Sequence, residues 1–274
     1  MAQTHQPLTP EPAAASMMRD PVVLENDGQK VFGVIHRPAG SPSTPRPAVA
    51  IFHGLVGSKD QPHQLYVKLA EALARAGLIA LRFDFRGRGD SEGETVDITP
   101  EADISDATKA LDYLVAQPDV DLQRLGLVGH SWGGMIGACL AGRGARVAAL
   151  VMWSSVPGGV MEWSPPFREI DGRQVAELWG NLVGRAFYEG LRHINTLQEI
   201  RTTRAPLLIV YGTEDEAISA TSVEGATRLL TEAGVAHEVV AIDGADHTFM
   251  RYEWEREAIE RTVTWLCHAL SVEA

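Results

Sequence analysis

The pentapeptide Gly129–Gly133 fits the pattern G-x-S-x-G, with Ser131 at its centre. It lies between the short apolar run Leu125–Val128 and a stretch of small and apolar residues, Met135–Leu140. Where a strand turns sharply into a helix, the central serine of this pattern stands exposed above the sheet, and the glycines avoid collisions between the two elements. The sequence therefore predicts a nucleophilic serine at position 131.

A serine hydroxyl is a weak nucleophile, so it needs a general base, and the base needs a carboxylate that orients it. His247 follows the apolar run Val239–Ile242 through a loop rich in Gly and Asp, and Asp215 follows the apolar run Leu207–Tyr211. The carboxyl ends of parallel strands meet at one edge of a sheet, which would bring the three residues together. We expect Ser131 as nucleophile, His247 as base and Asp215 as acid.

Other residues near these positions have the same chemistry. Glu214 and Glu216 flank Asp215, and either carboxylate could be the acid instead. His247 is one of nine histidines, and it is the one that follows a late strand in a Gly- and Asp-rich loop. The interpretation favours Asp215 and His247 for that reason.

Acyl transfer also needs hydrogen-bond donors for the oxyanion. His53-Gly54-Leu55 follows an apolar strand that ends at Phe52, and the backbone N–H groups of Leu55 and Trp132 would converge on the carbonyl oxygen of a substrate. We interpret His53 as a residue that braces this loop rather than as a base. The Gly-rich turn Asp84–Ser91 is expected to stabilise the same loop through its polar side chains.

The elements that must position these residues alternate between strands and helices. The strands are predicted from continuous apolar runs at 48–52, 78–83, 125–128, 147–153, 207–211 and 239–242. The helices between and after them are predicted from apolar faces at 65–76, 104–115, 223–233 and 259–270. A hairpin at 22–35, with a turn at Asn26-Asp27-Gly28, precedes them. This order predicts an α/β fold with a mostly parallel sheet and helices on both faces.

The interval 155–204 interrupts the alternation, and we expect it to be a helical lid over the site, with helices around 172–180 and 181–200. Aromatic residues in and beside it are candidates for an acyl or aryl pocket, although each could equally be a core residue. They are Trp153, Trp163, Phe167, Trp179 and Phe187.

Length and composition are those of one globular domain, expected at 21–274 after a disordered tail at 1–20 that is rich in Pro, Ala, Thr and Gln. The net charge of −12 argues against nucleic acid and anionic membrane as partners. No apolar run approaches the ~20 residues of a membrane span. The first residues have no basic start and no apolar core, so a cytoplasmic location is expected.

Cofactors are not expected. The two cysteines are too few for a disulfide framework, and no His or Cys cluster has the spacing of a metal site. The glycines form neither a phosphate-binding loop nor a dinucleotide-binding fingerprint.

The motifs occur in a characteristic order along the chain. The serine turn at 129–133 is accompanied by the His53-Gly54 loop, the turn Asp84–Ser91, Gly212-Thr213-Glu214-Asp215 and Gly244-Ala245-Asp246-His247. Over residues 21–271 the chain resembles the serine α/β-hydrolases. Its opening hairpin, the segment His53–Lys59 and the insertion after the sixth strand resemble cinnamoyl and feruloyl esterases and related carboxylesterases.

The resemblance implies an eight-stranded, mostly parallel sheet, a catalytic triad of Ser131, His247 and Asp215, and a covalent acyl-enzyme. It also implies hydrolysis of esters of small organic acids, often aromatic ones. A thioesterase or a small-acyl amidase or peptidase would use the same triad, and a hydrolase-fold binding protein without turnover would be expected to lack one of its members. The expected partner is a small-molecule ester, and the oligomeric state stays open, a homodimer included.

Overall fold

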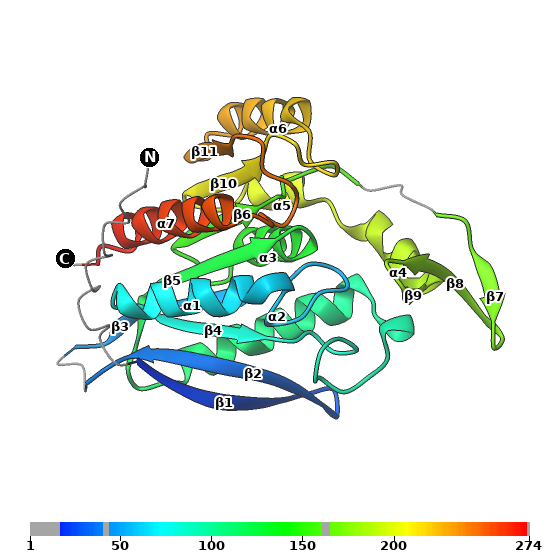
Figure 1. Cartoon of the computed structure of the whole chain (residues 1–274), viewed down its shortest axis with the longest axis horizontal. Coiled ribbons are helices and arrows are strands. Elements are labelled where there is room, and N and C mark those ends of the chain that lie inside the picture. The colour runs from blue at the N-terminus through cyan, green and yellow to red at the C-terminus, as the bar shows by residue number, and fades with distance from the viewer. Residues whose placement is uncertain (1–16, 41–43, 161–164, 273–274) are drawn as a thin grey trace, which may run out of the picture.

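The computed structural model describes residues 17–40, 44–160 and 165–272. Its central feature is an eight-stranded sheet with the order β1-β2-β4-β3-β5-β6-β10-β11 (Figure 1). The strands are β1 (Met17–Asn26), β2 (Gln29–Pro38), β3 (Arg46–Phe52), β4 (Ile79–Phe83), β5 (Val120–His130), β6 (Ala149–Trp153), β10 (Leu207–Gly212) and β11 (His237–Ile242). Only the pairs β1–β2 and β2–β4 are antiparallel, so the predicted mostly parallel sheet is confirmed.

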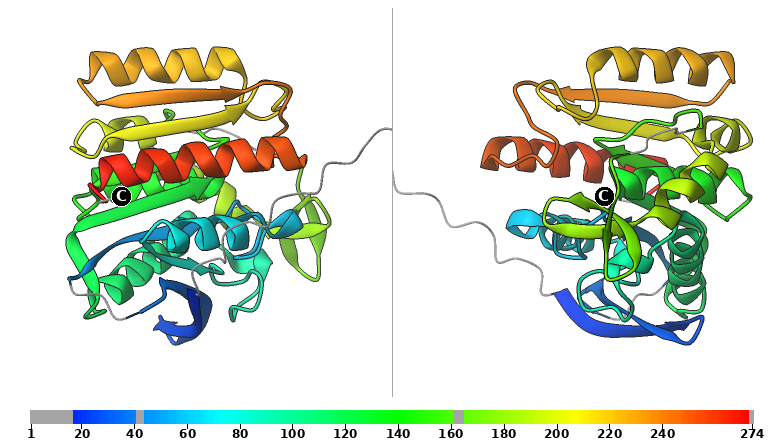
Figure 2. Two further views of the ribbon diagram at one scale, coloured as in Figure 1. Left: turned by 60° about the vertical axis from the view of Figure 1, so that its left-hand side comes forward. Right: turned by 90° about the vertical axis from the view of Figure 1, so that its right-hand side faces the viewer.

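Helices cover both faces of this sheet (Figure 2). Those that connect or follow its strands are α1 (Leu65–Arg75), α2 (Pro100–Val115), α3 (Trp132–Gly142), α6 (Ala220–Glu232) and α7 (Tyr252–Ala269). Buried residues of α1 and α7 share one core, and buried residues of α2, α3 and α6 share the other.

The continuous apolar runs of the sequence follow from this double coverage. In β3, Ala48, Ala50 and Phe52 face the core of α2 and α3, whereas Val49 and Ile51 face the core of α1 and α7. Successive side chains of a strand point to opposite faces, so a strand buried on both sides needs apolar residues at every position.

The opening hairpin is longer than predicted. Its turn is at Asp27-Gly28, where both residues have positive φ angles of 49° and 75°. Residues Met17–Asp20, which the sequence assigned to the tail, belong to β1 and pair with the end of β2. Pro21 is compatible with this strand because β1 lies at the edge of the sheet. The rest of the predicted tail, 1–16, lies outside the described residues.

The predicted helix at 172–180 is wrong, and the segment predicted as a helix around 181–200 begins as a strand and continues as short helices. The segment between β6 and β10 holds a three-stranded antiparallel sheet followed by short helices (Figure 1). Its elements are β7 (Arg168–Ile170), β8 (Arg173–Leu178), β9 (Asn181–Gly184), α4 (Arg185–Gly190) and α5 (Thr196–Ile200). Both turns of the small sheet, Asp171-Gly172 and Trp179-Gly180, place two consecutive residues at positive φ, as a tight hairpin turn requires.

A close backbone contact joins this small sheet to the rest of the domain. A Cβ atom added to Gly184, at the end of β9, would lie 2.2 Å from the carbonyl oxygen of Val96. Glycine is therefore required where β9 meets the loop before α2. Within the described part of the chain, no helix has the length and apolar character needed to cross a membrane.

Candidate active site

Ser131 lies at the sharp turn between β5 and α3, with φ 53° and ψ −120°. This is a strained conformation for a residue with a side chain. A Cβ atom on Gly129 would lie 2.2 Å from the carbonyl oxygen of Gly133, and one on Gly133 would lie 2.3 Å from that of Phe52. The two glycines of the motif are thus needed for the backbone to pass, and the turn holds the serine at the end of its strand.

Asp215 and His247 form the predicted pair. His247 Nδ1 lies 2.9 Å from both carboxylate oxygens of Asp215, whose side chain is fully buried. The same carboxylate accepts hydrogen bonds from the N–H groups of Ala217 and Ile218 at 2.8 and 3.0 Å. Nδ1 of His247 therefore donates to Asp215, which leaves Nε2 as the nitrogen that can take a proton.

The pKa of Asp215 lies below its usual value. Burial raises the pKa, but the hydrogen bond from His247 and the two backbone N–H groups lower it by more. The Asp215 carboxylate therefore stays ionised. Its neighbours Glu214 and Glu216 are exposed, so Asp215 is the carboxylate that contacts the histidine.

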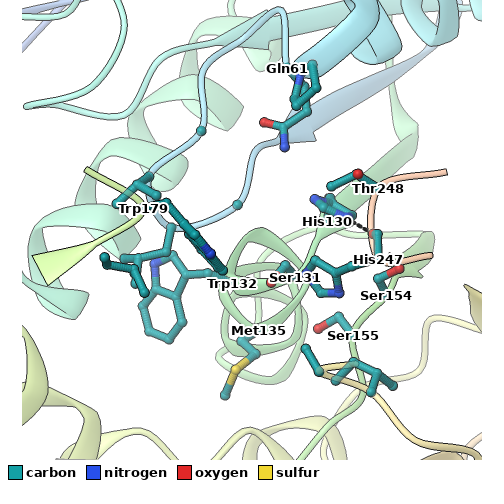
Figure 3. Close-up of a pocket in the computed structure, with 18 of the residues that line it drawn as sticks. Gln61, His130, Ser131, Trp132, Met135, Ser154, Ser155, Trp179, His247 and Thr248 are labelled. Carbon is teal, nitrogen blue, oxygen red and sulfur yellow. Dashed lines mark hydrogen bonds between the residues drawn. The ribbon is translucent and has the colours of Figure 1, made fainter. Parts of the chain in front are cut away.

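Ser131 and His247 both line one cavity of about 810 Å³. Figure 3 shows both side chains among the residues around it. Leu55 and Trp132, the two residues predicted to supply oxyanion donors, line it as well. Trp132 is the first residue of α3, and N–H groups in the first turn of a helix have no acceptor within the helix.

His53 braces the loop after β3, as predicted. Its Nδ1 donates to the carbonyl oxygen of Gly54 at 2.7 Å, and its Nε2 accepts a hydrogen bond from the N–H of Phe85 at 3.0 Å. Burial lowers the pKa of His53 to about 3, so the ring is neutral and its tautomer is fixed by these two bonds. A side chain with both nitrogens engaged is a structural link and not a base.

The turn Asp84–Ser91 also contacts this loop. Asp84 accepts hydrogen bonds from Lys59 Nζ at 2.8 Å and from the N–H of Asp90 at 2.9 Å. A Cβ atom on Gly89 would lie 2.2 Å from the Asp84 carboxylate. The polar side chains of the turn thus fix the segment that carries Leu55, in agreement with the expectation from the sequence.

His130 is a residue of the site that sequence reasoning missed. Its Nε2 donates to the backbone carbonyl oxygen of His247 at 2.7 Å (Figure 3), and its side chain is buried. Burial lowers its pKa to about 4, so the ring is neutral. The variable second position of G-x-S-x-G carries no signal for this contact.

Only some of the aromatic residues predicted to form the pocket line the cavity. Trp179 and Phe187 line the cavity. Trp153 does not: its Nε1 donates to Thr262 on α7 at 2.7 Å, because the alternation of β6 turns its ring toward the opposite face. Phe167 packs on Tyr188 and is not part of the lining, so both pocket assignments are wrong. Trp163 lies outside the described residues.

The remaining lining is mostly apolar with a few hydroxyl and amide groups. The apolar side chains include Met135, Leu178, Leu191 and Ile218, and the polar ones include Gln61, Ser154 and Ser155. Among the described residues that line the cavity, none is lysine, arginine, aspartate or glutamate. No local pattern marks these residues, because they come from elements that are far apart in the sequence.

Comparison with known proteins extends these observations. An uncharacterised Mycobacterium tuberculosis protein, Rv2307c, is 30% identical over 250 residues, which cover 87% of this chain and 76% of that protein. Est1E from Butyrivibrio proteoclasticus, solved with bound ferulic acid, has a TM-score of 0.77 at 20% identity and covers 91% of this chain and 99% of its own.

A second solved structure is the dienelactone hydrolase-like promiscuous phosphotriesterase P91 from metagenomic libraries. Its TM-score is 0.64 at 19% identity, with coverage of 92% of this chain and 98% of its own. At these identities the two structures establish a common fold. The sequence itself matches the dienelactone hydrolase family model over residues 32–269, which is most of its length, and the chain therefore belongs to the dienelactone hydrolase family, within the α/β-hydrolase superfamily.

Proposed function

We propose that this protein is a serine esterase that hydrolyses uncharged carboxylic esters of small acids, aromatic acids included, through an acyl-enzyme on Ser131. One observation carries the proposal. Ser131, at a strained strand-to-helix turn, shares a cavity with His247, and His247 is hydrogen-bonded to the buried carboxylate of Asp215.

In the proposed cycle, His247 Nε2 takes the proton of Ser131 Oγ as the oxygen attacks the ester carbonyl. The N–H groups of Leu55 and Trp132 stabilise the oxyanion. His247 then gives the proton to the departing alkoxide, and the alcohol leaves. A water molecule, deprotonated by His247, attacks the acyl-enzyme, and collapse of the second oxyanion releases the acid and restores Ser131.

The lining of the cavity supports an uncharged substrate. Its described residues offer no lysine or arginine to pair with an anionic group elsewhere on the substrate, away from the reacting carbonyl, and burying an unpaired anion there would be costly. Trp179 and Phe187 provide flat apolar surfaces of the kind that an aryl group packs against. The binding of ferulic acid to Est1E, a protein of the same fold, agrees with an aromatic acid.

Thioesters and small amides could react through the same groups, so substrate preference is tested with a panel. We expect p-nitrophenyl esters and methyl ferulate to be hydrolysed, with turnover lost in Ser131→Ala. A fluorophosphonate probe followed by peptide mass spectrometry should label Ser131. Esterase activity that survives in Ser131→Ala would refute the proposal.

A further inference from the structure

The two residues proposed to bind the oxyanion belong to different elements. Leu55 lies in the loop after β3, and Trp132 begins α3. Their N–H groups can act on one oxygen atom only if the distance between the two elements is fixed, since each donor must lie about 2.7–3.1 Å from the oxyanion. The backbone hydrogen bonds of sheet and helix do not join these two residues directly.

A single ion pair contacts both of them. Arg88, in the turn Asp84–Ser91, donates from Nη1 to the carbonyl oxygen of Leu55 at 3.3 Å and to Asp103 Oδ2 at 3.2 Å. Its Nη2 donates to Asp103 Oδ1, so the pair is bidentate. Asp103, on α2, also accepts a hydrogen bond from the indole Nε1 of Trp132 at 2.7 Å.

We infer that Arg88 and Asp103 are positioning residues for oxyanion binding, because this one pair ties the loop of Leu55 to the side chain of Trp132. The inference rests on the proposed esterase function. Arg88 fixes the peptide plane that follows Leu55, and Asp103 fixes the indole of Trp132 and with it the first residue of α3.

The burial of the Arg88–Asp103 ion pair is not explained by a gain in the stability of the fold. The two side chains are 2% and 0% exposed, and burying charges is costly even when they are paired. Burial raises the pKa of Asp103 although Arg88 and Trp132 lower it, and Arg88 Nε has no hydrogen-bond partner among the described residues. An apolar contact would fill the same space at lower cost, so the pair has a use that apolar side chains would not serve.

The same pair shapes the wall of the cavity. The Trp132 ring packs edge-on against Phe187 at a centroid distance of 5.2 Å, and both residues line the cavity. If the side chain of Trp132 became mobile, the main effect would be weaker stabilisation of the transition state by its backbone N–H. A smaller effect would be a change in the contact between Trp132 and Phe187 of the lid.

The chain offers a matched control. Asp106 lies one turn along α2 from Asp103, is equally buried, and forms a bidentate pair with Arg86 of the same turn. Its other described hydrogen bond from a side chain comes from Asn26 in the opening hairpin. Asp106→Asn thus removes a buried charge of the same kind from the same helix without touching Leu55 or Trp132.

The test compares Asp103→Asn with Asp106→Asn. We expect Asp103→Asn to lower kcat for p-nitrophenyl butyrate by about tenfold to a hundredfold with KM within about threefold. The inhibition constant of a trifluoromethyl ketone, which forms an oxyanion on the serine, should rise in parallel. Binding of the product alcohol, which has no carbonyl oxygen, should stay unchanged. Asp106→Asn should lower the melting temperature while it keeps kcat and trifluoromethyl ketone affinity.

Equal losses in both variants, or a stable Asp103→Asn with unchanged ketone affinity, would overturn the inference. If Asp103→Asn does not fold, Trp132→Phe removes the indole donor while it keeps an aromatic ring against Phe187, and it should weaken ketone binding more than binding of the product alcohol. A wild-type protein that hydrolyses no ester, or whose Ser131 is not labelled by fluorophosphonate, would instead overturn the proposed function, so the two failures are distinguishable.

Discussion

His130 and His247 are joined by a hydrogen bond from the side chain of the first to the backbone carbonyl oxygen of the second, at 2.7 Å. The residue before the proposed nucleophile thus holds the backbone of the proposed base. Their rings lie 5.0 Å apart between centroids. The buried, neutral imidazole of His130 thus connects the end of β5 to the loop after β11, which is remote in sequence.

Loss of this bond is expected to lower turnover. His130→Phe keeps a ring of similar size but removes the donor, so the loop of His247 should loosen and kcat should fall by about tenfold with little change in KM. His130→Gln restores an N–H donor and should recover part of the loss. Steady-state kinetics with p-nitrophenyl acetate measure both, and equal kcat in the Phe variant and the wild type would contradict the role.

Substitution of Asp215, the proposed acid, is expected to have a larger effect. Asp215→Asn would remove the negative charge that stabilises the protonated imidazole, and its amide NH2 group would favour the wrong tautomer, so kcat should fall by about a thousandfold or more. Glu214→Gln and Glu216→Gln change exposed neighbours and serve as controls with near wild-type rates. A larger loss in either control than in Asp215→Asn would show that the acid is assigned to the wrong residue.

Buried histidines predict a loss of stability in mild acid. The pKa of His53 is lowered to about 3 and that of His130 to about 4, both from 6.5 and both mainly by burial. Each contributes stability that is fully present above pH 6.5 and is lost as the pH falls from 6.5 to the folded-state pKa, because between these two values only the unfolded chain binds the proton. The expected loss at pH 5 is about 2 kcal/mol for each histidine.

Urea unfolding at pH 7.5 and pH 5 measures this loss. His130→Gln removes one of the titrating groups, so its stability should fall less between the two pH values than that of the wild type. The same pH dependence in the variant and in the wild type would contradict the assignment.

The exposed tryptophan of the small sheet is expected to act on substrate binding and not on stability. Trp179 is 78% exposed and lines the cavity. Trp179→Ala should raise KM for methyl ferulate several-fold, change KM for p-nitrophenyl acetate less, and alter the free energy of unfolding by no more than about 0.5 kcal/mol. Tyr252→Ala, at a residue that is 69% exposed and outside the lining, is the matched control.

Much of the fold follows from local sequence patterns. Strands buried on both faces, such as β3 and β10, can be recognised in the sequence as unbroken apolar runs. Helices α1 and α2 can be recognised by apolar residues at helical spacing. Ser131, Asp215 and His247 were predictable because each lies shortly after an apolar run that forms a strand, namely β5, β10 and β11. Their common place at the sheet edge is a property of parallel strands.

What the sequence did not reveal depends on contacts between distant segments. The sequence predicts helix where the small sheet lies, because the strands of this sheet are short and partly exposed. The signal for its hairpins is in turn pairs such as Asp171-Gly172. Trp153 was assigned to the pocket because composition does not say toward which face a strand residue points. Arg88 and Asp103 belong to a turn and a helix whose proximity only the tertiary structure defines.

The insertion that carries Trp179 and Phe187 begins after β6 and ends before β10, and these two strands are direct neighbours, with Leu150 paired to Leu207. A segment whose two ends leave and re-enter adjacent strands can change in length and sequence without altering the register of the sheet. Residues 155–204 could therefore be exchanged between family members to engineer new substrate preferences while the eight-stranded sheet is kept.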